Sequence, residues 1–224
     1  MSGHSVVASD GRTWTLGRRV EHDEASRLYP AVAVAAPLSS AQHVHHGPVL
    51  DQGNLGSCTG NAAAQCLNTE PFAGPSLLDE NAAVAIYSWA THHDKYYGSY
   101  PPDDTGSSGL AVAKAVRHLG LISTYRHAFG LAHVLGALVL QPVIIGIPWM
   151  NDMFTPDAQG YLSPTGGVAG GHEVALIEIS VEEESVTLLN SWGAGWGHNG
   201  TAKLRWTDLG TLLAQQGDCT VFVR

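Results

Sequence analysis

The stretch PVLDQGNLGSCTGNAAAQC, residues 48–66, joins an extended apolar run, a glycine-rich turn and an alanine-rich segment that predicts a short helix. The turn meets the predicted helix at Cys58. Free backbone N–H groups and the helix dipole favour negative charge at a helix N-terminus, so a thiol there gains thiolate character. Cys58 is therefore a candidate nucleophile. The alternative is a buried, inert cysteine, as most free cysteines are, and the rest of the chain has to supply a base.

The composition of the chain limits which partners, metals and cofactors we expect it to bind. The chain has 224 residues, 44% of them hydrophobic, which is enough for a full core in one domain or two lobes. The net charge is −9 and no Lys/Arg cluster occurs, so we expect no nucleic-acid partner and no anionic membrane partner. Cysteines at positions 58, 66 and 219 cannot build a disulfide framework and lack zinc-ligand spacing. We expect no metal site and no cofactor.

The N-terminal residues carry no secretory signature. They lack a continuous apolar core after basic residues, and no apolar run in the chain approaches the roughly 20 residues of a membrane span. The expected location is cytoplasmic, or exported without a recognisable signal peptide. Residues 1–36 show no sustained period and are too few for their own core. We interpret them as an arm lying over the main domain.

Helical patterns occupy the first half of the chain and strand patterns the second. A helix is predicted after an N-cap at Ser76, running to about His93, and a loop follows over residues 94–108. This order predicts an α+β protein with two unlike lobes. The remaining predicted helices are 110–119 and 131–138, and the predicted strands are 142–147, 173–179, 185–189, 201–205 and 220–223.

Two stretches in the strand-rich half carry candidate catalytic groups. His172 stands where a glycine loop, Gly170-Gly171, enters a predicted strand. The sequence NSWGAGWGHNG, residues 190–200, directly follows the next strand. A lone histidine at a strand start is more often structural, whereas two tryptophans and four glycines after an asparagine are rarely a chance pattern. A site between the lobes would combine Cys58 with His172 and Asn190.

Three motifs in chain order resemble those of the papain-like cysteine peptidases. They are QGNLGSC at residues 52–58, Gly171-His172, and NSWG at residues 190–193. The form DQGNLGSCT resembles the bacterial and viral branch. The resemblance covers residues 37–224 and implies the papain-like two-lobe fold, with a helical lobe over about 37–130, a β-rich lobe over about 131–224 and a cleft between them. Residues 1–36 would then be an N-terminal arm or short pro-like segment.

The resemblance implies a role for each motif residue. Cys58 attacks a peptide carbonyl, and His172 holds the proton and returns it to the leaving amine. Asn190 orients the imidazole, and Trp192 covers the contact between them. Gln52, six residues before Cys58, donates to the oxyanion together with the Cys58 backbone N–H.

The substrate cleft is expected to be lined by five residues: Ser107, Ser108, Gly171, Glu173 and Trp192. Glu173 stands where the family usually has a small residue, often lining the pocket for the second residue before the scissile bond. One hypothesis is an acidic pocket that favours Lys or Arg; the other is that Glu173 points away along its strand.

Besides Glu173, three features depart from the family pattern. Leu55 replaces a common disulfide cysteine, and Thr59 replaces the usual aromatic residue after the nucleophile. The interval from Cys58 to His172 is somewhat shorter than the roughly 130–150 residues typical of the family.

The function predicted from the sequence is a cysteine endopeptidase acting on a peptide or protein substrate, with self-inhibition by the arm. The same thiol site also serves cell-wall peptide hydrolases, amidases and transpeptidases. A non-catalytic scaffold with this fold is the other alternative. The joint presence of Gln52, Cys58, His172 and Asn190 speaks against the scaffold, because a binding module does not need all four.

Overall fold

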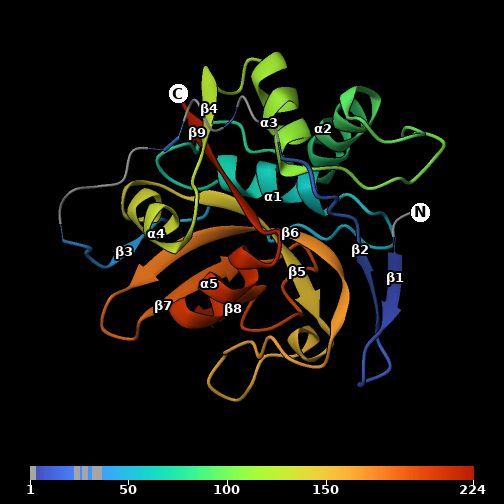
Figure 1. Ribbon diagram of the computed structural model, residues 1–224. Coiled ribbons are helices and arrows are strands. Elements are labelled where there is room, and N and C mark those ends of the chain that lie inside the picture. Colours follow the sequence, from blue (N-terminus) through green and yellow to red (C-terminus); the bar gives the residue numbers. More distant parts are fainter. Residues whose placement is uncertain (1–3, 23–25, 27–29, 32–36) are drawn as a thin grey trace.

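A twisted antiparallel sheet separates two sets of helices (Figure 1). The computed structural model describes residues 4–22, 26, 30–31 and 37–224. Most of the apolar run 30–37 lies outside the described residues. The elements in chain order are β1 His4–Val7, β2 Thr13–Leu16, β3 Ala41–Gln42, α1 Cys58–Leu67, α2 Glu80–His93, α3 Gly109–His118, β4 Thr124–His127, α4 Leu131–Leu140, β5 Val143–Met150, η2 Asn151–Phe154, β6 Val168–Ser180, β7 Ser185–Leu189, β8 Thr201–Arg205, α5 Trp206–Ala214 and β9 Asp218–Val223.

The large sheet has seven strands in the order β4-β9-β5-β6-β7-β8, with β3 added on β6. All its pairings are antiparallel, and β6 is central, pairing with β3, β5 and β7. Every residue of β5 is buried, as expected for a strand covered on both faces. Its sequence, VIIGIPWM, supplies β-branched and aromatic side chains to both sides. The predicted α+β class is confirmed.

Two hydrophobic cores flank the sheet. Helices α1, α2 and α3 pack on each other and take Ile144, Leu189 and Phe222 from the sheet. Helices α4 and α5 pack against the other face of the same strands in a second core. In Figure 1 the first three helices lie together above the sheet. Because β4 precedes residue 130 yet pairs with β9, the sheet extends into the segment predicted as helical lobe.

Local signals placed most elements correctly, with two kinds of exception. The N-cap of α2 is Asp79, whose side chain accepts from the Ala82 N–H at 2.9 Å, so the prediction of a cap at Ser76 was wrong. No local pattern predicted β1, β2, β3, β4 or α5. Helix α5 starts directly after β8, and Arg205 at its N-cap makes no capping bond, which leaves little to recognise. None of the described helices is long and apolar enough to cross a membrane.

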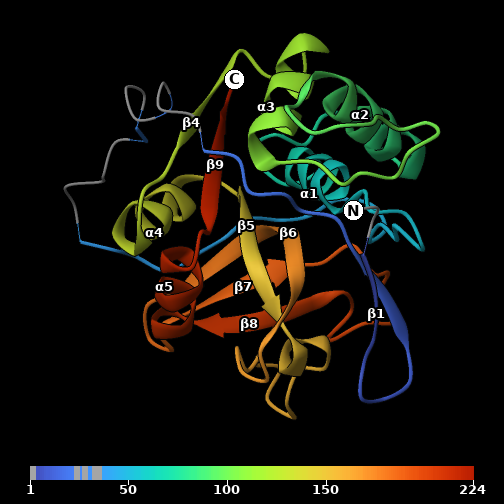
Figure 2. The ribbon, with the colours of Figure 1, turned by 45° about the vertical axis from the view of Figure 1, so that its right-hand side comes forward.

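The described part of the arm starts with a hairpin and then crosses the molecule. Strands β1 and β2 pair antiparallel, with His4 opposite Leu16. After β2 the chain crosses between the helices and the sheet, which Figure 2 shows as the blue segment running between α3 and β5. There it bridges Ser107 on one side and bonds Gly171 on the other. An extended segment held on both sides through its backbone needs no hydrophobic period, which explains the absence of a pattern in residues 17–19.

Candidate active site

Cys58 is the first residue of α1, and its side chain is 0% exposed. All ten residues of α1 are buried. Gly60, in its first turn, lets α2 approach closely, because a β-carbon there would lie 2.3 Å from the Ala83 carbonyl oxygen. The alanine-rich sequence therefore allows α1 to run through the centre of the molecule with the thiol at its N-terminal end.

His172 and Asn190 form the second part of the site. His172 Nε2 lies 2.7 Å from Asn190 Oδ1, and both residues are fully buried. The pairing of β6 with β7, which sets Ala175 opposite Leu189, brings the two side chains to the same end of the sheet. Gln65 on α1 donates from Nε2 to the Asn190 carbonyl oxygen at 3.2 Å. The helix that carries the thiol thus holds the asparagine loop directly.

Aromatic rings enclose the His172–Asn190 contact. Trp192 stacks on the imidazole with ring centroids 4.7 Å apart and planes at 24°, and Trp149 approaches the imidazole edge-on at 4.9 Å. Trp14 of the arm stacks on Trp192 at 4.7 Å. Rings around this hydrogen bond exclude water and strengthen it in a low local dielectric.

The Gln52 side chain is directed into the same space. Its Oε1 accepts from the Ser191 hydroxyl at 2.6 Å, which fixes the amide. Its Nε2 donates to the Leu55 carbonyl oxygen at 2.8 Å and to the Thr15 carbonyl oxygen of the arm at 3.2 Å. The amide N–H therefore already binds a carbonyl oxygen beside the thiol.

The arm fills the space that these residues surround. The backbone N–H of Arg18 donates to the Gly171 carbonyl oxygen at 3.0 Å, and the backbone N–H of Ser107 donates to the Gly17 carbonyl oxygen at 2.9 Å. A β-carbon on Gly17 would lie 2.0 Å from the Gly56 carbonyl oxygen, so only glycine fits at this point. The arm is held through its backbone by both walls.

Burial sets the protonation of the two reactive groups. It raises the pKa of Cys58 to about 12, although backbone hydrogen bonds from Glu173, Gly17 and Thr59 act in the opposite direction. Burial also lowers the pKa of His172 to about 4, against the raising effect of its bond to Asn190. With the arm in place both groups are neutral at pH 7. The expectation that the helix N-terminus makes Cys58 a thiolate is wrong for this state, because desolvation outweighs the helix.

The five predicted cleft residues all lie around the arm. Ser107 bonds its backbone, and the Ser108 hydroxyl donates to Glu21 Oε2 at 2.6 Å while capping α3. Gly171 accepts from the arm, and Trp192 stacks against Trp14. The Glu173 side chain is fully buried rather than directed to solvent.

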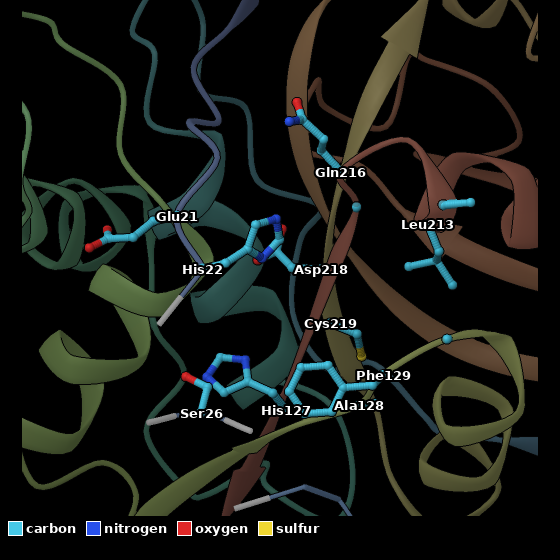
Figure 3. Close-up of a pocket in the computed structure, with 13 residues that line it drawn as sticks. Glu21, His22, Ser26, His127, Ala128, Phe129, Leu213, Gln216, Asp218 and Cys219 are labelled. Atoms are coloured by element: carbon cyan, nitrogen blue, oxygen red, sulfur yellow. The ribbon is translucent and has the colours of Figure 1, made fainter. Parts of the chain in front are cut away.

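Sequence reasoning missed the groups that come from distant segments. Trp14, Gly17 and Arg18 belong to the arm, and Asp218 begins the last strand. None sits in a recognisable motif, and their contacts with the site depend on the tertiary fold. A cavity of about 360 Å³ lies beside the arm, with walls from three segments (Figure 3). These are the arm at Glu21, His22 and Ser26, the segment 127–130 from the end of β4, and residues 213–214 and 216–219 from the end of α5 to the start of β9.

The sequence matches no protein-family model and no curated protein. Solved structures do match. Xylellain, a cysteine protease from Xylella fastidiosa, aligns with a TM-score of 0.71 at 17% identity, covering 93% of this chain and 95% of its own. Digestive procathepsin L 3 of Tenebrio molitor larval midgut aligns at 0.65 and 16%, covering 87% and 73%. The Carica candamarcensis cysteine protease CMS1MS2, solved with E-64, aligns at 0.56 and 16%, covering 82% and 99%. This chain has the papain-like fold of those cysteine proteases.

Proposed function

We propose that the chain is a cysteine peptidase that hydrolyses peptide bonds with Cys58, His172, Asn190 and Gln52. The carrying observation is the buried 2.7 Å contact between His172 and Asn190. The Cys58 thiol, at a helix N-terminus, contacts the backbone of Glu173, the residue after His172. A structural histidine would not need this asparagine, an aromatic cover and a nearby amide donor together. The fold of known cysteine proteases supports the same assignment.

Each of these residues has its own role in the proposed hydrolysis. His172 takes the Cys58 proton, and the sulfur attacks the scissile carbonyl carbon to give a tetrahedral oxyanion. Gln52 Nε2 and the Cys58 backbone N–H donate to that oxygen. The C–N bond breaks as His172 protonates the leaving amine, and a thioester remains on Cys58. Water, deprotonated by His172, then attacks the thioester and releases the carboxylic acid and the thiol.

The test combines turnover with labelling of the thiol. Gly17→Ala should loosen the arm, and this variant should hydrolyse fluorogenic peptides and form a thioether with a peptide vinyl sulfone at Cys58. Cys58→Ala in the same background should abolish both, whereas Cys66→Ala, in the same helix, should preserve both. Absence of labelling and turnover at every pH from 5 to 8, in a variant whose arm is shown to be displaced, would contradict the proposal.

We further propose that the arm inhibits the site in the resting chain. The support is that the Gln52 side chain and the Cys58 thiol contact different residues of the arm. Gln52 donates to the Thr15 carbonyl, whereas the Cys58 thiol receives a backbone hydrogen bond from Gly17. A productive substrate has to present one and the same carbonyl to both groups. The arm therefore occupies the site in a geometry that excludes substrate without being cleaved.

A further inference from the structure

Arg18 is the most enclosed charged side chain of the described arm. Its side chain is 2% exposed and extends into a pocket formed by Glu173 on β6 and Asp218 on β9. The guanidinium Nη2 donates to Asp218 Oδ1 and, at 2.7 Å, to the Gln216 carbonyl oxygen. The pocket adjoins the thiol, because Gly17, the preceding residue, contacts Cys58.

The pocket holds two carboxyl groups, and Arg18 forms an ion pair with only one of them, Asp218. Glu173 is 0% exposed, and neither of its carboxylate oxygens has a hydrogen-bond donor among the described residues. Burial first, and the nearby Asp218 second, raise the pKa of Glu173, while Arg18 lowers it. Two carboxylates kept in such a place are costly unless a cation accompanies them. The geometry thus requires a positive group here.

The shape of the pocket fits a planar cation. Its floor is Gly146 on β5, where a β-carbon would lie 2.5 Å from Arg18 Nε, 2.5 Å from Asp218 Oδ1 and 2.6 Å from Glu173 Oε2. Gly109, at the start of α3, leaves similar room beside Glu173. Acceptors on several sides of a flat slot match the fixed donors of a guanidinium better than the single nitrogen of a lysine.

We propose that Glu173 and Asp218 form a specificity pocket for an arginine side chain of the substrate, which Arg18 occupies in the resting chain. This inference rests on the proposed peptidase function. The class of substrate is a peptide or protein with an arginine within a residue or two of the bond that is cut, because Arg18 directly follows the arm residue at the thiol. Glu173 and Asp218 act on selection and not on the reacting atoms.

The cavity beside the arm offers access for a small probe. Asp218 and Gln216, which hold the guanidinium, also line that cavity (Figure 3). The first experiment uses the inactive full chain Cys58→Ala with Arg18→Ala, titrated with ethylguanidinium or with the uncharged ethylurea. Ethylguanidinium should raise the thermal midpoint saturably, and ethylurea should not. Adding Glu173→Gln or Asp218→Asn should abolish the rise, and Glu178→Gln, a carboxylate on the same strand, should leave it intact.

The second experiment measures selectivity in the chain that keeps Cys58 and carries Gly17→Ala, which displaces the arm, together with Arg18→Ala. A peptide library in which one arginine or one citrulline moves through the positions flanking the bond should show at least a tenfold preference for arginine at one position. Glu173→Gln with Asp218→Asn should remove that preference while citrulline peptides are still cut. Equal cleavage of both series, or equal response to both probes, overturns the pocket. Guanidinium binding without any peptide hydrolysis overturns the peptidase function and leaves the pocket standing.

Discussion

The Gln52 side chain is fixed by Ser191 and also binds the arm. Ser191 fixes its oxygen at 2.6 Å, and the amide nitrogen holds the Thr15 carbonyl of the arm at 3.2 Å. An amide held in this way costs little reorganisation when an oxyanion forms in place of that carbonyl. The side chain therefore serves both the resting arm and the proposed reaction.

Gln52→Ala in the Gly17→Ala background should lower kcat by about 10²–10³, because one oxyanion donor is lost. Alkylation of Cys58 should not slow, since the arm loses a hydrogen bond as well. Ser191→Ala should lower kcat less, as it only frees the amide to rotate. An unchanged kcat in Gln52→Ala would remove this residue from the oxyanion site.

Gly17 allows the arm to dock against the turn that precedes α1. Because a β-carbon would lie 2.0 Å from the Gly56 oxygen, Gly17→Ala should displace this part of the arm. We expect iodoacetamide to alkylate Cys58 at least tenfold faster than in the unaltered chain at pH 7, as burial no longer holds the pKa of the thiol at about 12. Gly74→Ala, where a β-carbon meets no atom within 4 Å, is the control. Equal rates in all three chains would mean that the arm does not protect the thiol.

Asp79 caps the N-terminus of α2. Asp79→Ala should reduce the free energy of unfolding by about 1 kcal/mol, because the Ala82 N–H loses its cap. Ser76→Ala should have almost no effect, since Ser76 lies before the helix. Urea denaturation of both variants measures the difference, and a larger loss in Ser76→Ala would restore the cap expected from the sequence.

These elements also show what the sequence could and could not predict. Helix α3 was recognisable because its signals are local: an apolar face and Gly120 after its end. The structure adds the cap, Ser108, which was not predicted from the sequence. The residues of the proposed site were recognisable because Cys58, His172 and Asn190 sit in short motifs. The docking of the arm results from contacts between distant segments, such as Arg18 with Asp218, which are 200 residues apart. Asp218 approaches Glu173 because both pair with Gly146 of β5. No local pattern encodes them.

The stability of the whole molecule depends on pH, because His172 is neutral in the folded chain. The folded chain keeps the imidazole unprotonated down to about pH 4, whereas the unfolded chain binds a proton below the usual 6.5. Acidification from pH 6.5 to 4 should therefore weaken folding through this group, by up to about 3 kcal/mol. Urea denaturation of Cys58→Ala, with and without His172→Gln, should show a flatter pH dependence when the histidine is absent. Identical slopes would mean that His172 titrates normally in the fold.

The arm enters the cleft from its own hairpin, and the chain then continues to Leu38 as a covalent link. While that link is intact, the arm faces the cleft at an effective concentration on the order of millimolar, whatever the amount of protein. A single cut between the cleft and Leu38 would turn the same segment into a separate ligand. Its occupancy would then depend on its bulk concentration, so dilution alone would open the site after cleavage and would have no effect before it.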